Sequence, residues 1–213
     1  MIVKICGITS IDDALAAVGA GADMLGFNFY EKSPRCIRPS LCQQIISAIP
    51  AGKVFHVGVF VNMDVANILR IMKDCGLDLA QLSGDEPPQA LHFLGERAFK
   101  ALRPVDEDSL QADLARYPAR KGKPGWLVDA YRADAYGGTG HTADWQLAAN
   151  LAWQTPIILA GGLKPENVVQ AIEQVHPWGV DVASGVEISP GVKDHEKMCT
   201  FVENAKSAEM VRR

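Results

Sequence analysis

The sequence predicts an α/β fold, a single-domain (β/α)8 TIM barrel that spans residues 1–213. Short runs of β-branched and apolar residues alternate with amphipathic segments at helical spacing. Loops that contain glycine or proline separate the two kinds of segment. Eight such units fit in the chain at about 27 residues each, which is short for a barrel but sufficient to close one.

The first three units show the alternation most clearly. Predicted strands at residues 3–6, 24–29 and 54–61 precede predicted helices at 11–18, 41–49 and 65–72. Ser10 and Asp13 resemble a capping box at the start of the first helix. The third strand is almost continuously apolar, which is typical of a strand covered on both faces and favours a parallel sheet.

The later units follow the same order with shorter segments. We predict strands at 77–82, 99–102, 126–129, 157–160 and 180–183, and helices at 86–94, 110–117, 144–151, 165–175 and 198–205. An open doubly wound sheet has the same alternation, and the loss of one or two short strands would favour it. It therefore remains the competing architecture.

Composition narrows the class of protein. A content of 48% hydrophobic and 22% charged residues is that of an ordinary globular domain. The net charge of -4 and the dispersed Lys and Arg residues give no reason to expect nucleic acid or a membrane as a partner. Five scattered cysteines without metal-ligand spacing favour a reducing compartment, so we expect a cytoplasmic protein with no metal.

Three polar residues lie where a parallel α/β fold binds its ligands, at the carboxyl ends of the strands. Cys6 ends the first strand and can act as a general base if nearby cations stabilise its thiolate. Asp129 ends the sixth strand, where an apolar barrel mouth favours a general acid. Arg35, in the loop after the second strand, can bind a carboxylate with both arms of its guanidinium. Each residue also has a structural alternative. Cys6 could be a small buried hydrophobe, Asp129 a helix cap or ion-pair partner, and Arg35 a solvated surface charge.

Glycine-rich loops after the last strands indicate a phosphate site. We assign phosphate binding to backbone N–H groups at Gly138, Gly161, Gly162, Ser184 and Gly185. Paired glycines are also common in turns, but their coincidence after the seventh and eighth strands favours the phosphate site.

The strand pattern does not decide which side of the barrel wall Lys4 faces. Lys4 alternates with Ile5 and so shares a strand face with Cys6, which allows it to face the barrel interior.

Several segments, taken in chain order, resemble the phosphoribosylanthranilate isomerase family over essentially the whole chain. They include Lys-Ile-Cys-Gly at 4–7, Ser-Pro-Arg at 33–35, Gly-Gly-Thr-Gly at 137–140 and Ser-Gly-Val-Glu at 184–187. The resemblance implies an aldose-ketose isomerase of tryptophan biosynthesis. Its reaction is an Amadori rearrangement of N-(5-phosphoribosyl)anthranilate to 1-(2-carboxyphenylamino)-1-deoxyribulose 5-phosphate.

The resemblance also implies the roles of individual residues. Cys6 is the general base, Asp129 the general acid and Arg35 the group that holds the anthranilate carboxylate, and Asp181 lies near the anthranilate. The glycine segments after the last two strands hold the phosphate. The expected partner is a phosphorylated small molecule and no cofactor is implied; we expect a monomer, with a homodimer as the alternative.

The sequence departs from the family pattern at three places. Ser83 stands where the family often has His, Cys36 where an aromatic residue commonly follows the Arg, and Ala143 where Phe usually precedes Asp-Trp. These differences affect the packing of the anthranilate pocket and remove no proposed catalytic group.

Two other functions stay in competition. One is another phosphosugar-processing barrel enzyme, such as a ribulose-phosphate epimerase or indoleglycerol phosphate synthase, which use metal-bound acids and a catalytic Lys, respectively. The other is a non-catalytic phosphate-ligand-binding barrel, which would bind its ligand without turnover.

Overall fold

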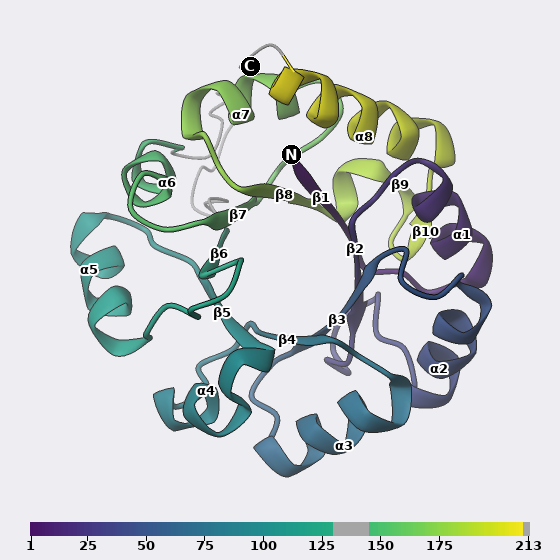
Figure 1. Cartoon of the computed structure of the whole chain (residues 1–213), viewed down its shortest axis with the longest axis horizontal. Helices are drawn as coiled ribbons and strands as arrows, with labels where there is room; N and C mark the ends of the chain where they lie inside the picture. The colour runs from purple at the N-terminus through teal and green to yellow at the C-terminus, as the bar shows by residue number, and fades with distance from the viewer. Residues whose placement is uncertain (130–144, 211–213) are drawn as a thin grey trace.

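Eight parallel strands close into a barrel in which each strand pairs with its neighbours in sequence order. The computed structural model describes residues 1–129 and 145–210, and Figure 1 views the barrel along its axis. Because β8 also pairs in parallel with β1, the sheet has no edges, which confirms the barrel and excludes the open doubly wound sheet. The strands are β1 (Ile2–Cys6), β2 (Met24–Asn28), β3 (Phe55–Phe60), β4 (Leu79–Leu82), β5 (Ala98–Leu102), β6 (Trp126–Asp129), β7 (Ile157–Ala160) and β8 (Gly179–Val182).

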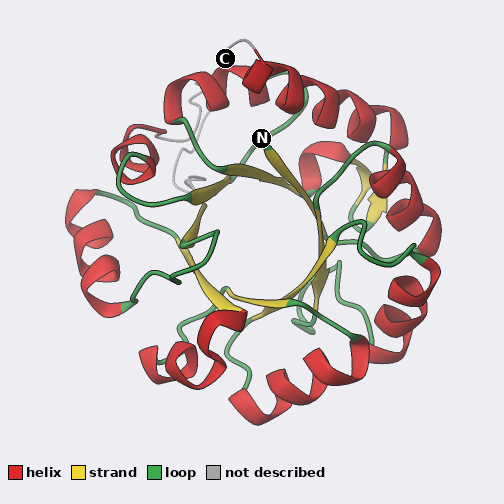
Figure 2. Ribbon diagram, in the orientation of Figure 1, coloured by secondary structure: helices red, strands yellow, loops and turns green. Residues whose placement is uncertain are grey.

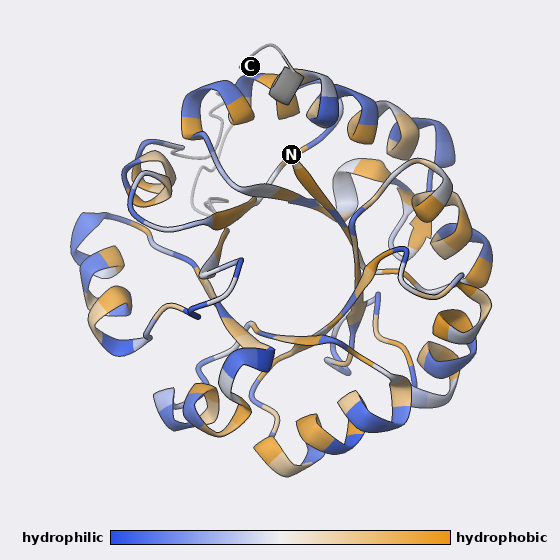
Figure 3. Cartoon of the chain, in the orientation of Figure 1, coloured by the Kyte–Doolittle hydropathy of each residue, from blue (hydrophilic) through white to orange (hydrophobic). Residues whose placement is uncertain are grey.

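Helices surround the barrel in a single outer layer (Figure 2). They bury their apolar stripes against the strands, as the hydropathy colouring shows (Figure 3). No helix in the described part of the chain is long and apolar enough to span a membrane. The helices are α1 (Ile11–Gly19), α2 (Pro39–Ala48), α3 (Val65–Cys75), α4 (Pro88–Leu94), α5 (Glu107–Arg116), α6 (Trp145–Ala152), α7 (Val168–Val175) and α8 (His195–Met210).

Two helices begin two or more residues later than predicted, because side chains hydrogen-bond to the backbone that precedes them. The carboxylate of Glu86 accepts hydrogen bonds from the backbone N–H groups of Asn62 and Gly84, so α4 begins two residues later than expected. Asn167 accepts from the backbone of Lys164 and holds a turn in front of α7. Only one half of the predicted capping box forms: the Ser10 hydroxyl accepts from the N–H of Asp13, but the Asp13 carboxylate contacts the Lys193 N–H and His195 instead.

The sequence analysis missed a small substructure between β8 and α8. A 3-10 helix η2 (Ser184–Val186) leads into a hairpin of β9 (Glu187–Ser189) and β10 (Val192–Lys193). The hairpin is tied to the loop after β1, where the Thr9 hydroxyl donates to the Gly191 carbonyl at 2.5 Å. It therefore lies at the carboxyl end of the barrel.

The barrel interior is filled by alternate strand residues, which form an apolar cluster separate from the core under the helices. Residues directly opposite in a sheet face the same side. Lys4 is opposite Met24 of this interior cluster, and also opposite Asp181 on β8. Lys4 and Asp181 therefore both face the inside of the barrel, which settles the question that strand alternation left open. The cluster comprises Met24, Val57, Leu79, Phe99, Ala101, Leu127, Ile158 and Ala160.

Truncating a side chain between the barrel and its helices will cost much of the stability of the fold. Phe60 is fully buried on β3 and stacks on Phe29 with ring centroids 5.3 Å apart. We expect Phe60→Ala to lower the free energy of unfolding by about 3–5 kcal/mol. Urea denaturation followed by circular dichroism measures this. Phe93→Ala, at a 71% exposed position on α4, is the control, and equal losses in both variants would contradict the prediction.

Candidate active site

Cys6 ends β1 at the carboxyl mouth of the barrel, as predicted. Its half-buried side chain lies over Gly26 of β2, where a side-chain carbon would lie only 2.7 Å from the sulfur. The same carbon would lie 3.1 Å from the Lys4 ammonium. The thiol and the ammonium thus converge on one point, and only a glycine at this position leaves room for both.

Charged groups surround the thiol on several sides. The Lys4 ammonium is fully buried and pairs with the Asp181 carboxylate at 2.8 Å. Lys193, also fully buried on β10, donates to the backbone carbonyl of Cys6 at 2.6 Å. Burial raises the pKa of the Cys6 thiol, Lys4 and Lys193 oppose that rise, and Asp181 adds to it. The cations that a thiolate needs are present, but burial outweighs them, so the pKa of the thiol lies above its ordinary value.

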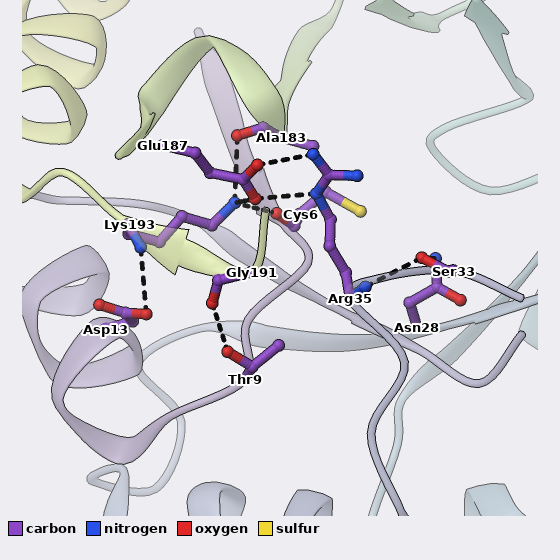
Figure 4. A network of polar contacts seen from close by, with 10 residues as sticks. All are labelled: Cys6, Thr9, Asp13, Asn28, Ser33, Arg35, Ala183, Glu187, Gly191 and Lys193. Carbon is purple, nitrogen blue, oxygen red and sulfur yellow. Dashed lines mark hydrogen bonds and ion pairs between the residues drawn. The ribbon is translucent and has the colours of Figure 1, made fainter. Parts of the chain in front are cut away.

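Arg35 is held at the same mouth by a bidentate ion pair. Its Nε and Nη2 donate to the two carboxylate oxygens of Glu187 at 2.8 and 2.6 Å (Figure 4). A side-chain carbon on Gly7 would lie 2.5 Å from the Arg35 side chain, so Arg35 crosses directly over the turn that follows Cys6. Its side chain is 22% exposed. The alternative of a freely solvated charge is therefore wrong.

Glu187 and Lys193 are site residues that the sequence analysis did not identify. Lys193 donates to Glu187 at 2.9 Å and to the Ala183 carbonyl at 3.1 Å, in addition to Cys6 (Figure 4). Burial alone would raise the pKa of Glu187, but hydrogen bonds from Arg35 and Lys193 hold it below its usual value. Glu187 belongs to the Ser-Gly-Val-Glu segment at 184–187. No local pattern identifies Lys193, because one of its partners, Cys6, lies 187 positions away in the sequence.

Asp129 lies across the mouth from Cys6. Asp129 ends β6 two residues after Leu127, so it shares the inner face of that strand. Two strands, β7 and β8, separate β6 from β1 around the barrel. The Asp129 carboxylate is 32% exposed, with Oδ2 at 3.9 Å from Arg103 Nε. An exposed ion pair at that distance contributes little to stability. Asp129 thus lies at the carboxyl end of β6, where the sequence predicts it.

The glycine loops between these two groups lie against each other. A side-chain carbon on Gly185, after β8, would lie 1.9 Å from the carbonyl oxygen of Leu163, after β7. Gly161 and Gly162 have φ angles of 96° and 64°, which side chains rarely allow. Ser184 begins η2, and the first N–H groups of a helix have no partner within it, so they can bind an anion. Gly138 lies outside the described residues.

The remaining residues that the sequence analysis singled out have separate surroundings. Asp181 faces the barrel but is engaged by Lys4. Ser83 is buried, and its hydroxyl accepts a hydrogen bond from Gln81 Nε2 at 3.1 Å. Cys36 is half-buried beside β2, and its backbone forms an isolated parallel β-bridge with that of Asn28. Ala143 lies outside the described residues.

Comparison with known proteins assigns the family. Residues 3–204 match the model of the N-(5'phosphoribosyl)anthranilate (PRA) isomerase family. The chain belongs to this family. An N-(5'-phosphoribosyl)anthranilate isomerase from Citrifermentans bemidjiense is 47% identical over 209 residues, which cover 98% of each chain.

Solved structures agree with that assignment. Phosphoribosyl anthranilate isomerase from Thermotoga maritima superposes with a TM-score of 0.86 at 41% identity, over 97% of this chain and 100% of that one. A phosphoribosyl anthranilate isomerase in complex with reduced 1-(o-carboxyphenylamino)-1-deoxyribulose 5-phosphate has a TM-score of 0.84 at 39% identity, over 97% and 100% of the two chains. A 3-hexulose-6-phosphate synthase shares the fold alone, with a TM-score of 0.68 at 12% identity over 96% and 99%.

The raised pKa of Cys6 predicts slow alkylation at neutral pH. Only the thiolate reacts with iodoacetamide, so the rate at Cys6 should rise with pH to a midpoint above the value of about 8.5 of an unperturbed thiol. Mass spectrometry of the Cys6 peptide after timed alkylation between pH 6 and 11 measures the midpoint, with a short cysteine peptide as the reference. A midpoint at or below that of the reference would show that the cations outweigh burial.

Proposed function

We propose that this chain isomerises N-(5'-phosphoribosyl)anthranilate to 1-(o-carboxyphenylamino)-1-deoxyribulose 5-phosphate. The family assignment supports this reaction, as does the related structure that binds the reduced product. One geometric observation carries it. The glycine loops after β7 and β8 lie between Cys6 and Asp129 around the barrel mouth. A substrate with its phosphate on those loops would have its sugar between a base and an acid.

In the proposed mechanism Asp129 first opens the sugar ring. Its carboxyl donates a proton to the ring oxygen, the bond from that oxygen to C1' breaks, and the nitrogen lone pair forms a C1'=N iminium. The iminium acidifies the proton on C2', because the electrons left behind can move onto nitrogen. Proton transfer from C2' then needs only a base at that face.

The Cys6 thiolate takes the C2' proton. An S–H bond forms, and the C2'–H electrons become the C1'=C2' double bond of an enolamine, while the iminium electrons return to nitrogen. Protonation at C1' and loss of the proton from the C2' hydroxyl give the ketose. No electrons are gained or lost overall, so the reaction as written calls for neither a metal nor a redox cofactor.

Arg35 and Asp181 have proposed roles at the anthranilate end. The anthranilate carboxylate would bind the guanidinium of Arg35, whose remaining N–H groups can donate while Glu187 holds the other edge. Asp181 is proposed to lie near the anthranilate. Its inward-facing position on β8, where it pairs with Lys4, supports this role.

Location and assembly are proposals of the same kind. We infer a cytoplasmic enzyme, supported by five cysteines that are all free thiols. A relative from Thermotoga maritima is described as a dimer from which monomers have been generated. For this chain we retain the monomer as the expectation and the homodimer as the alternative, to be separated by analytical ultracentrifugation.

Removing either proposed catalytic group should abolish most turnover. We expect Cys6→Ser and Asp129→Asn each to lower kcat by about 10²–10⁴-fold, the usual contribution of a positioned acid or base. The loss of anthranilate fluorescence as phosphoribosylanthranilate is consumed measures kcat. Cys199→Ser, at an exposed position on α8, should keep wild-type turnover. An inactive wild type would contradict the proposed function, and an active Cys6→Ser variant would contradict the assigned base.

The phosphate loops can be tested separately from the chemistry. Gly185→Ala places a carbon against the Leu163 carbonyl and must push the two loops apart. We expect KM to rise about tenfold or more, equivalent to about 1.4 kcal/mol of lost binding, and inhibition by inorganic phosphate to weaken in parallel. Gly19→Ala is the control, because nothing lies within 4 Å of its added carbon. An unchanged KM in Gly185→Ala would exclude these loops as the phosphate site.

A further inference from the structure

The barrel interior contains a buried ion pair between Lys4 and Asp181. Lys4 is fully buried and Asp181 is 9% exposed, and they meet at 2.8 Å beside the apolar interior cluster. Removing both charges from water is costly, and replacing a buried ion pair by apolar side chains is often neutral or stabilising. A buried, charged pair at a binding mouth therefore points to a role in the chemistry of the site.

The position of Lys4 connects that pair to Cys6. The two residues are two positions apart on β1 and share its inner face. Their side-chain ends converge over Gly26, where one added carbon would touch both the sulfur and the ammonium nitrogen. The ammonium thus has two neighbours that can carry negative charge, Asp181 and the sulfur.

The other charged groups near the thiol are already engaged. Lys193 on β10 directs its ammonium to two backbone carbonyls and to Glu187 on β9. Arg35, from the loop after β2, is occupied on one edge by the same glutamate. Asp181 on β8 is negative and therefore disfavours the thiolate. Among the described residues, Lys4 is the cation near Cys6 that lies inside the barrel together with its carboxylate partner, Asp181.

We propose that Lys4 is a positioning residue for Cys6, and that its ammonium, fixed by Asp181, is the counter-charge that stabilises the Cys6 thiolate. This inference rests on the proposed function, in which that thiolate is the general base. Asp181 keeps the lysine protonated: burial alone would lower the pKa of Lys4, and Asp181 and Cys6 raise it above its ordinary value. Asp181 then acts on the reaction through Lys4, in addition to any contact with the anthranilate.

The test is the pH dependence of Cys6 alkylation in Lys4→Met. Removing a neighbouring opposite charge shifts a pKa by about one unit or more. The alkylation midpoint of Cys6 should therefore be higher in Lys4→Met than in the wild type by that amount. Lys4→Arg keeps the charge and should stay close to wild type. If Lys4→Met does not fold, Lys4→Gln tests the same shift, since its amide can still donate to Asp181.

Lys100→Met is the matched control. Lys100 is 3% exposed and pairs with Glu86 at 2.9 Å, so this variant also removes a buried lysine from a carboxylate. Lys100 lies on β5 and points away from the barrel interior, with its ammonium over the Tyr117 ring. We expect it to leave the Cys6 midpoint unchanged.

Activity gives a second readout. With Lys4 acting through the thiolate, turnover of Lys4→Met should fall at pH values below the wild-type Cys6 midpoint and recover as the pH rises toward the variant's own midpoint. An unchanged alkylation midpoint in Lys4→Met, or an equal shift in Lys4→Arg, would overturn the proposal. Alkylation needs no substrate, so these results hold even if the wild type fails to isomerise phosphoribosylanthranilate, which would contradict the proposed function alone.

Discussion

The pairing of β8 with β1 is the constraint on which the site depends. It closes the sheet, and its register places Lys4 opposite Asp181 and Ile5 opposite Val182. Because strand side chains alternate, a shift by one residue would move Lys4 and Cys6 from the interior to the helix-facing side. The same closure brings the loop after β8 beside the end of β1, although 177 residues separate Lys4 from Asp181.

A second set of interactions fixes the mouth once the barrel is closed. Lys193 reaches from the hairpin to carbonyls at the ends of β1 and β8, and it shares Glu187 with Arg35. The buried ammonium is satisfied by oxygens on three elements, as a buried charge must be. The hairpin after β8 therefore connects the strand that carries the thiol to the loop that carries the guanidinium.

The sequence was sufficient for the architecture and for most positions around the mouth. The strands ending at Asp129 and Ala160 fall at their predicted bounds, because apolar runs bounded by glycine or proline leave little choice. Helix starts were less predictable, since the side chains of Glu86 and Asn167 capture backbone groups that periodicity cannot reveal. The hairpin that carries Lys193 has too short a strand to give a periodic signal.

The electrostatics of Cys6 could not be predicted from sequence, because they depend on competition between burial and charges from distant segments. In the free protein the effect of burial is larger than that of the neighbouring lysines, so the pKa of the Cys6 thiol is raised. A higher pKa makes the thiolate scarcer but also a stronger base. In the proposed mechanism the ring-opened substrate is an iminium, which brings a further positive charge beside the sulfur at the step that needs the thiolate. The fixed charge of Lys4 and the transient charge of the substrate would then act together, and the thiol would remain protonated until the substrate is bound and opened.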